Sequence, residues 1–346
     1  MNLARIIGII VCLGGCAEDR RLESSPGKAK KPAAELPSSG DAVDEVRGPV
    51  AGNPGWEGAA PGSSAGPAGP GWSQEPGNTG AAELPDQPDV VSGTTDNPCL
   101  ALEATSYDEP GPWKVVAGKP PGGYRLWLPE NLGEGGCRHP VIAWGNGTGV
   151  SDANIYQGFM RHWASYGFIV IGSNMPMTAD GKHIGAGLDW VKKQGEPGGA
   201  FAGKVGDIHG TAGHSQGGLG AAAAAMADDS VRALVGAQGG PIDKGMKAPV
   251  LFIAGTNDIF NGLMDSGWVN NSSPTVKATL KGADHIGTPT TEINQRTDRG
   301  RQYLLATVAW FRCLLMDDAV ACPLVMGENP EMCENPVWDS CERKNF

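Results

Sequence analysis

Ser215 of this 346-residue chain lies in a Gly-x-Ser-x-Gly motif, a pattern that can support nucleophilic catalysis. The motif reads Gly213-His214-Ser215-Gln216-Gly217, between an expected strand over 205–212 and an expected helix that begins at Gly217. In that context a strained turn exposes the serine hydroxyl, and the flanking glycines avoid collisions with neighbouring backbone. The alternative is an ordinary glycine-rich turn. The strand and helix around the motif favour Ser215 as a nucleophile.

A serine hydroxyl is a weak nucleophile until a base takes its proton, so a histidine must lie within hydrogen-bond reach. The chain has six histidines. His285 is the candidate, because it follows a late expected strand and fits the chain order of nucleophile, acid and histidine. We expect His214, the neighbour of Ser215, to point away from the site.

The histidine in turn needs a carboxylate that orients it. Asp258 follows the apolar run over 250–254, which places its carboxylate at the C-terminal edge of the predicted sheet. Asp284 competes for this role, but a residue adjacent to His285 in sequence usually cannot turn its carboxylate onto the same imidazole. The sequence therefore predicts a triad of Ser215, His285 and Asp258.

Acyl transfer also requires N–H donors that stabilise the oxyanion of the tetrahedral intermediate. The backbone amide of Gln216, directly after the nucleophile, is one expected donor. The glycine-rich turn over 145–149 should supply the other, with Gly147 as first choice and Thr148 as second. No Gly-Lys-Ser/Thr follows these glycines, which argues against a phosphate-binding loop.

Several apolar residues near these motifs are candidates for lining an acyl pocket, although each could equally belong to the core. They are Trp144, Ile259 and Phe260. We expect no metal at this site.

The elements that must position these residues alternate along the chain. Strands are expected over 124–128, 141–144, 168–171, 205–212, 231–235, 249–254 and 275–280, and helices over 155–166, 183–194, from Gly217 onward and over 299–314. Short, almost wholly apolar strands separated by helices are typical of a parallel sheet that is buried on both faces. We therefore predict an α/β fold over residues 98–346, with a mostly parallel central sheet and helices on both faces.

The N-terminal residues differ in composition from the rest of the chain. Residues 1–16 combine Arg5 with a short apolar run and end in Leu13-Gly14-Gly15-Cys16, which is similar to a bacterial lipoprotein signal with Cys16 as the lipidated residue. A plain secretory signal is the alternative. Residues 17–97 lack apolar periodicity and contain many Gly and Pro, so we expect a disordered linker. Together these features predict export and attachment to a membrane through an N-terminal lipid.

Cysteine usage agrees with export. When Cys12 and Cys16 are set aside, an even number remains, which fits three disulfides in an oxidising compartment: Cys99, Cys137, Cys313, Cys322, Cys333 and Cys341. No Cys-x-x-Cys pair occurs among them, so a zinc site is a poor explanation. The sequence does not determine which of these cysteines pair with one another.

Charge and composition exclude several classes of function. The formal net charge is −11, so the chain lacks the basic surface that nucleic-acid binding needs. No apolar stretch reaches the roughly 18 residues of a transmembrane helix.

From about Cys99 to Phe346 the chain resembles the bacterial polyesterase, lipase and cutinase group of α/β-hydrolases, which includes poly(ethylene terephthalate) hydrolases. The resemblance rests on the elbow at Ser215, on Asn257-Asp258 and His285, and on several flanking phrases: Leu102-Glu103-Ala104, Gly111-Pro112-Trp113, Ser165-Tyr166-Gly167-Phe168-Ile169-Val170, and Cys322 with Glu328-Asn329-Pro330. It implies an α/β-hydrolase fold and a cofactor-free serine carboxylic-ester hydrolase that uses the predicted triad. The substrate that it implies is an ester, either a small molecule or a polymer.

The sequence departs from that group at positions that bear on the substrate. Gly147 stands where an aromatic residue is common, Gly239-Gly240-Pro241 stands where a Trp is common, and Gln216 replaces a frequent Met. We therefore expect short- to medium-chain aliphatic esters to be preferred over aromatic polyesters. Two other readings are a catalytically inactive surface lipoprotein that binds a polymer or partner, and an amide or peptide hydrolase.

Overall fold

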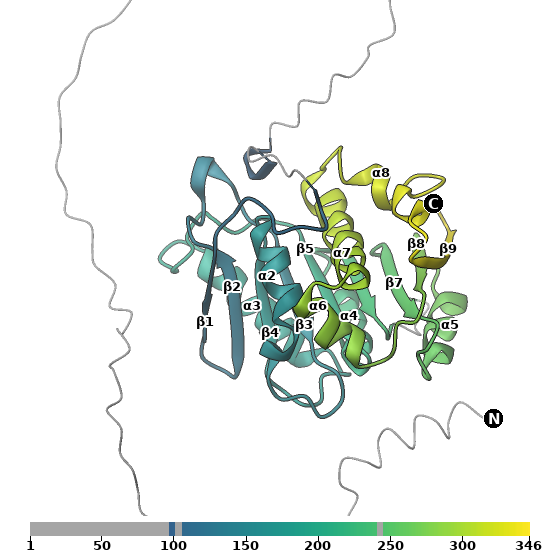
Figure 1. The fold of residues 1–346 in the computed structure, drawn as a ribbon. Helices are drawn as coiled ribbons and strands as arrows, with labels where there is room; N and C mark the ends of the chain where they lie inside the picture. Colours follow the sequence, from purple (N-terminus) through teal and green to yellow (C-terminus); the bar gives the residue numbers. More distant parts are fainter. Residues whose placement is uncertain (1–96, 101–105, 241–244) are drawn as a thin grey trace, which may run out of the picture. The chain divides into compact units, whose positions relative to one another are not determined.

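Nine strands of the described chain form one sheet, parallel at its centre and antiparallel at its edges (Figure 1). The computed structural model describes residues 97–100, 106–240 and 245–346. The spatial order is β1-β2-β4-β3-β5-β6-β7-β8-β9, and every pairing from β4 to β8 is parallel. The strands are β1 Val115–Gly118, β2 Tyr124–Pro129, β3 Val141–Gly145, β4 Ile169–Ser173, β5 His209–His214, β6 Val231–Ala237, β7 Val250–Gly255, β8 Thr275–Leu280 and β9 Trp338–Lys344.

Helices cover both faces of this sheet. The helices of the described residues are α2 Gln157–Ser165, α3 Lys182–Gly195, α4 Gln216–Ala227, α5 Asn261–Asn270, α6 Ile293–Gln295, α7 Asp298–Met316 and α8 Cys322–Val325. The described chain also contains five short helical turns: η1 Pro98–Leu100, η2 Glu134–Gly136, η3 Ala153–Tyr156, η4 Thr288–Glu292 and η5 Glu331–Glu334. In Figure 1, α2 and α7 lie in front of the sheet.

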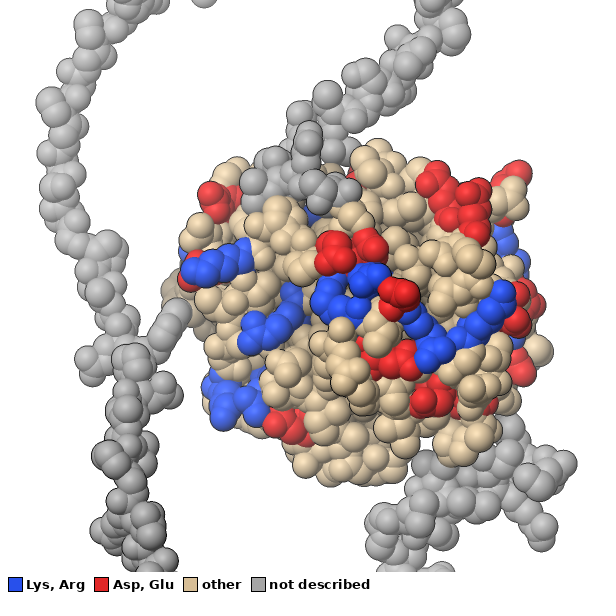
Figure 2. All heavy atoms as spheres, in the orientation of Figure 1, with Lys and Arg blue, Asp and Glu red and all other residues tan. Residues whose placement is uncertain are grey.

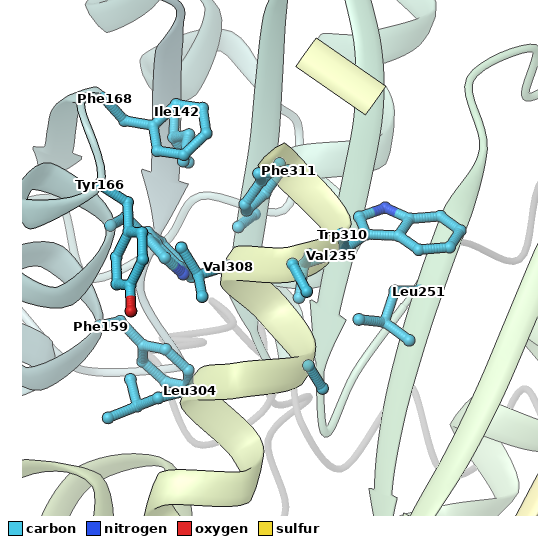
Figure 3. Packing of buried hydrophobic residues seen from close by; sticks show 14 of the residues in the cluster. Ile142, Phe159, Tyr166, Phe168, Val235, Leu251, Leu304, Val308, Trp310 and Phe311 are labelled. Atoms are coloured by element: carbon cyan, nitrogen blue, oxygen red, sulfur yellow. The ribbon is translucent and has the colours of Figure 1, made fainter. Parts of the chain in front are cut away.

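The two faces have separate hydrophobic cores because side chains alternate along each strand. On β3, Ile142 and Trp144 belong to the core shared with α2 and α7, while Val141 and Ala143 belong to the core shared with α3 and α4. Figure 3 shows the first core, in which Phe311 of α7 lies close to residues of the sheet. Packing on both faces fixes the strands, and with them the loops at their C-terminal ends.

The predicted α/β architecture, with a mostly parallel sheet and helices on both faces, is confirmed. The predicted strand over 205–212 is wrong at its start. Val205 forms only an isolated bridge with His139, and the strand begins at His209. Strands β1 and β9 were not predicted, because both are edge strands whose residues are mostly exposed or half-buried and so carry no apolar alternation.

Two sequence predictions lie outside the described residues. They are the lipoprotein signal over 1–16 with Cys16, and the linker over 17–97 apart from Asn97. Within the described residues, none of the helices has both the length and the apolar character that a membrane crossing requires.

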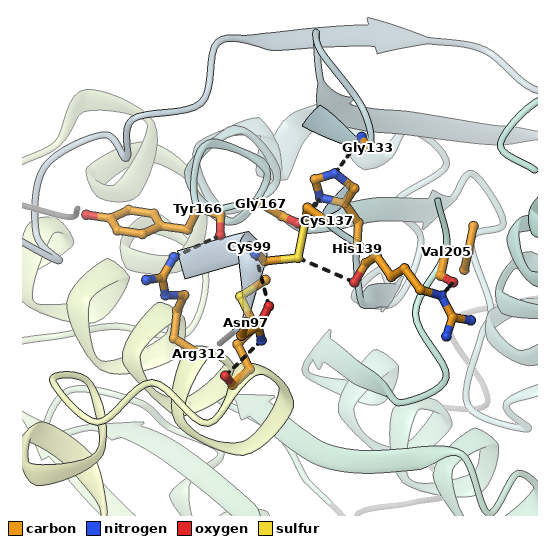
Figure 4. Close-up of a disulfide and its surroundings, with 11 residues drawn as sticks. Asn97, Cys99, Gly133, Cys137, His139, Tyr166, Gly167, Val205 and Arg312 are labelled. Atoms are coloured by element: carbon orange, nitrogen blue, oxygen red, sulfur yellow. Dashed lines mark hydrogen bonds between the residues drawn. A yellow bond between two sulfur atoms is a disulfide. The ribbon is translucent and has the colours of Figure 1, made fainter. Parts of the chain in front are cut away.

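Three disulfides join the six cysteines, as the sequence predicted, and the structure supplies their pairing. Cys99 pairs with Cys137, Cys313 with Cys322, and Cys333 with Cys341. The first bond ties the beginning of the described chain to the segment before β3, next to His139 (Figure 4). It spans a sequence separation of 38, against 9 and 8 for the other two. In the chain-entropy model it contributes about 4 kcal/mol, and the shorter ones about 3 kcal/mol each.

We expect none of these six cysteines to react as a free thiol. Peptide mapping by mass spectrometry, after alkylation of the unfolded and unreduced protein, should find all six unlabelled, and alkylation after reduction serves as the control. Reduction should also lower the melting temperature, because each disulfide restricts the unfolded chain. Six labelled cysteines without reductant would contradict both the pairing and the inference of export.

Candidate active site

Ser215 lies at a sharp turn between β5 and α4. Its backbone angles, φ 56° and ψ −122°, are uncommon for a residue other than glycine and turn the chain directly from strand into helix. A Cβ at Gly213 would lie 2.1 Å from the carbonyl oxygen of Gly217, and a Cβ at Gly217 would lie 2.1 Å from that of Gly145. Both glycines of the motif are therefore required by close backbone packing.

The structure brings Ser215, His285 and Asp258 into one hydrogen-bonded chain. His285 Nε2 lies 2.9 Å from Ser215 Oγ, and His285 Nδ1 lies 3.0 Å from each carboxylate oxygen of Asp258. An ionised carboxylate only accepts hydrogen bonds, so Nδ1 carries the proton and Nε2 is free to accept one from the serine hydroxyl. The Asp258 side chain is fully buried, and that of His285 is 11% exposed. This arrangement can deprotonate Ser215 as it attacks an electrophile.

Asp258 is held in place by its own loop, whereas the competing Asp284 is occupied elsewhere. Asp258 Oδ1 accepts a hydrogen bond from the Phe260 amide at 2.7 Å. Asp284 Oδ1 accepts from the amides of Ile286 and Gly287, at 2.9 and 2.5 Å. The Asp284 carboxylate thus organises the loop that carries the histidine and does not contact the imidazole.

Two buried residues that sequence reasoning missed contact the loop of His285. The expectation that His214 points away from the site is wrong: its Nε2 lies 2.7 Å from the carbonyl oxygen of His285, and its Nδ1 lies 2.9 Å from Tyr156 Oη. Gln238, directly after β6, donates from Nε2 to the carbonyl oxygen of Asp284. Both side chains bind main-chain atoms, which no sequence pattern identifies.

The two expected oxyanion donors differ in their surroundings. Gln216 is the first residue of α4, and the first amides of a helix have no partner within it. The Gly147 amide donates to Tyr156 Oη at 3.2 Å, and a Cβ at Gly147 would lie 2.6 Å from His214 Nδ1. Position 147 therefore faces the interior. Among the described residues, no partner binds the Thr148 amide, so this second choice is the free donor of the turn.

The Gln216 side chain connects the Ser215 turn to the turn over 145–149. Its Nε2 donates to the Pro176 carbonyl at 3.0 Å, and its Oε1 accepts from the Ala179 amide at 3.2 Å. The same Pro176 carbonyl accepts from the Gly149 amide at 2.9 Å. A methionine could not make these bonds, so the amide side chain gives this loop a fixed place beside the nucleophile.

The three candidate pocket residues lie in different environments. Trp144 is 0% exposed and packs between Tyr156, Phe159 and Trp163, so its assignment to a pocket is wrong and it belongs to the core. Phe260 lies beside the site, with its ring centroid 4.5 Å from that of His285. Ile259 is 84% exposed.

The described residues contain one group of three side chains close enough to share a metal ion: Cys99, Cys137 and His139. The two sulfurs form a disulfide, however. The ring nitrogens of His139 are bound to the Gly133 amide and the Gly167 carbonyl (Figure 4). These atoms are thus already engaged in holding the segment before β3.

No protein-family model matches this chain, and a search of curated proteins finds no relative. These comparisons therefore assign no function to the site.

Burial of neutral histidines should make the fold sensitive to acid. Burial lowers the pKa of His162 and of His214 to about 3, and that of His209 to about 4. An unfolded histidine titrates near a pKa of about 6.5, so below that pH the unfolded chain binds protons that the folded protein does not. The free energy of unfolding is therefore highest above pH 6.5. It decreases as the pH falls toward 4, by up to about 1.4 kcal/mol per pH unit for each histidine.

We therefore expect the melting temperature to fall steeply as the pH is lowered from 6.5 to 4. The depressed pKa of Asp228, about 2, acts only below this window. His209→Leu removes one of the three groups, lies far from Ser215 on β5, and should give a shallower pH dependence. A melting temperature that does not change over this range would contradict the neutral, buried state of these histidines.

Proposed function

We propose that this protein is an exported serine carboxylic-ester hydrolase with an α/β-hydrolase fold, acting through an acyl-enzyme on Ser215. The observation that carries the proposal is the continuous chain from Ser215 Oγ through His285 to the buried carboxylate of Asp258. The strained turn that presents Ser215 at the C-terminal end of a parallel strand supports the same fold assignment. The resemblance to bacterial polyesterases, lipases and cutinases agrees with it.

Each residue has a defined part in this mechanism. His285 Nε2 takes the proton of Ser215 as Oγ attacks the ester carbonyl carbon, and Asp258 stabilises the imidazolium that results. The amides of Gln216 and Thr148 donate to the oxyanion of the tetrahedral intermediate. The intermediate collapses as His285 returns the proton to the departing alcohol, leaving an acyl-serine. Water, deprotonated by His285, then attacks the acyl carbon. The bond between this carbon and Ser215 Oγ breaks as His285 returns the proton to the serine, and the carboxylic acid leaves.

The surroundings of Ser215 favour an aliphatic acyl group. Exposed apolar side chains flank both partners of the triad: Ile259 follows Asp258, and Ile286, 67% exposed, follows His285. A Cβ at Gly239 would lie 2.2 Å from the Ser215 carbonyl oxygen, and one at Gly240 would lie 2.0 Å from the Phe252 ring. These positions therefore have no room for the aromatic ring that is common there in the polyesterases that the sequence resembles. Position 147 faces inward and offers no ring either.

A panel of esters tests the function and the substrate class together. Short- and medium-chain soluble aliphatic esters should be hydrolysed readily, triglycerides more slowly, and aromatic polyester film weakly. The loss of two stacking contacts, each worth about 0.5–1.5 kcal/mol, predicts a roughly 5- to 150-fold lower rate on the aromatic unit. Ser215→Ala is the matched control for background hydrolysis. Film hydrolysis as fast as that of soluble esters would contradict the pocket argument, and no turnover of any ester would favour the inactive lipoprotein.

The cellular setting is part of the same proposal. Three disulfides support an oxidising compartment outside the cytoplasm, and we propose that lipid on Cys16 anchors the mature chain to the membrane. We propose no nucleic-acid partner. On the face shown in Figure 2, Lys and Arg are interspersed with Asp and Glu. Ion pairs of the described residues, such as Arg299 with Glu292 and Arg301 with Asp298, bring opposite charges together.

A further inference from the structure

Three consecutive main-chain carbonyls around His285 are each bound from a different strand end. The Ala283 carbonyl accepts from the Asn257 amide, after β7, at 3.0 Å. The Asp284 carbonyl accepts from Gln238 Nε2, directly after β6. The His285 carbonyl lies 2.7 Å from His214 Nε2, at the end of β5. The loop that carries His285 is therefore attached to the ends of three adjacent strands. Two of these three attachments are made by side chains.

The contacts of His214 fix its protonation. A carbonyl oxygen only accepts, so Nε2 must carry the hydrogen, and Nδ1 accepts from the Tyr156 hydroxyl at 2.9 Å. The Tyr156 oxygen accepts in turn from the Gly147 amide at 3.2 Å. Burial raises the pKa of Tyr156 to about 12 and lowers that of His214 to about 3. At neutral pH the histidine is therefore a neutral donor aimed at the His285 carbonyl.

The backbone of Gln238 directs its side chain at the same loop. Gln238 is 1% exposed and has φ 48°, a left-handed conformation that is uncommon outside glycine. Its own amide donates to the Ile253 carbonyl at 2.9 Å, which holds this turn against β7. The next residue, Gly239, packs directly on Ser215. One turn therefore contacts both the nucleophile and the loop of the base.

We propose that His214 and Gln238 are positioning residues that hold the main chain of Asp284 and His285 at the distance from Ser215 that catalysis needs. This inference rests on the proposed function. The Asp284 carboxylate binds amides of its own loop and shapes it from within, whereas His214 and Gln238 connect that loop to the sheet. Without them the imidazole would lose its fixed 2.9 Å approach to Ser215 Oγ, since its own backbone would be free to shift.

Four variants distinguish a positioning role of His214 and Gln238 from an effect on the overall stability of the protein. His214→Leu removes the donor, and His214→Gln restores one, because the glutamine amide can both donate to the His285 carbonyl and accept from Tyr156. Gln238→Asn keeps a residue that tolerates the left-handed conformation but is one methylene too short to reach Asp284. His209→Leu is the matched control, since His209 is also buried on β5 but lies at its other end, bound to the Val141 amide.

Kinetics on a short soluble ester give the first readout. His214→Leu and Gln238→Asn should each lower kcat by about 10- to 100-fold, with KM nearly unchanged, because a shift of about 1 Å in a reacting group costs that much. His214→Gln should recover most of the loss. His209→Leu should lower the melting temperature but leave kcat of the folded protein near that of the wild type.

Hydrogen exchange gives a readout that does not depend on activity. The amides of Ile286 and Gly287 should exchange faster in His214→Leu and Gln238→Asn than in His209→Leu. If His214→Leu does not fold, Gln238→Asn and His214→Gln decide the question. The inference is overturned if the two donor-removing variants affect kcat and exchange no more than His209→Leu. If the wild type hydrolyses no ester, the proposed function fails, while the exchange data still show whether the loop is held in this way.

Discussion

Replacement of Ser215 by alanine should lower kcat for ester hydrolysis by about 10⁶-fold while the protein stays folded. Serine, histidine and aspartate act as one unit, so loss of the nucleophile removes nearly all of their joint contribution, leaving what the oxyanion donors provide. Alanine can occupy the same turn, and the only hydrogen bond of Ser215 Oγ to the described residues is the one with His285, so we expect the fold to persist. Steady-state kinetics with a short aliphatic ester measures the effect, and a thermal melt verifies the fold.

His285→Ala is the companion variant. It should be about as damaging as Ser215→Ala, and the double variant should be hardly worse than either, because the two residues contribute through one proton transfer. If Ser215→Ala kept more than a trace of activity, or if the effects of the two single variants added, Ser215 could not be the nucleophile of a shared triad.

Asp258→Asn should lower kcat by roughly 10⁴-fold, whereas Asp284→Asn should change it by less than about 10-fold. Asparagine at 258 cannot orient a proton-bearing Nδ1 with both oxygens, and it presents an amide that favours the wrong tautomer of His285. Asparagine at 284 keeps an oxygen that can accept from the amides of Ile286 and Gly287. The pair is a matched test, since both variants remove one negative charge within the same site.

The comparison also tests the assignment of Asp258, and not Asp284, as the acid of the triad. Both variants should be measured at the same pH, with their melting temperatures, so that loss of fold is not read as loss of catalysis. If Asp284→Asn proves more damaging than Asp258→Asn, the assignment of the acid is wrong.

The sequence was most informative where chemistry and local structure constrain the same residues. The glycines of the Ser215 motif are required by backbone packing, and the acid and the histidine each follow a short strand of mainly buried residues, so their placement at one sheet edge could be predicted. The error at Trp144 came from its position beside the turn over 145–149. Trp144 and Ile142 are two residues apart on β3, so their side chains point to the same face of the sheet, into the core.

His214 and Gln238 could not be predicted, for a different physical reason. Each binds a main-chain carbonyl, and every residue has one, so the partner leaves no mark on the amino-acid sequence. The partners also lie 71 and 46 residues away. Only the folded sheet, which places the ends of β5 and β6 beside the loop of His285, brings these groups together.

The last strand of the chain protects the sheet from association with other molecules. β9 pairs with β8 and presents charged side chains along the outer edge, among them Asp339, Glu342 and Arg343. The neighbouring strand β8 has the sequence Thr-Val-Lys-Ala-Thr-Leu, a segment with high strand propensity. A chain that ended before Trp338 would leave that segment with unpaired backbone donors and acceptors, which favours pairing between molecules. Premature termination there is therefore expected to produce an aggregation-prone protein.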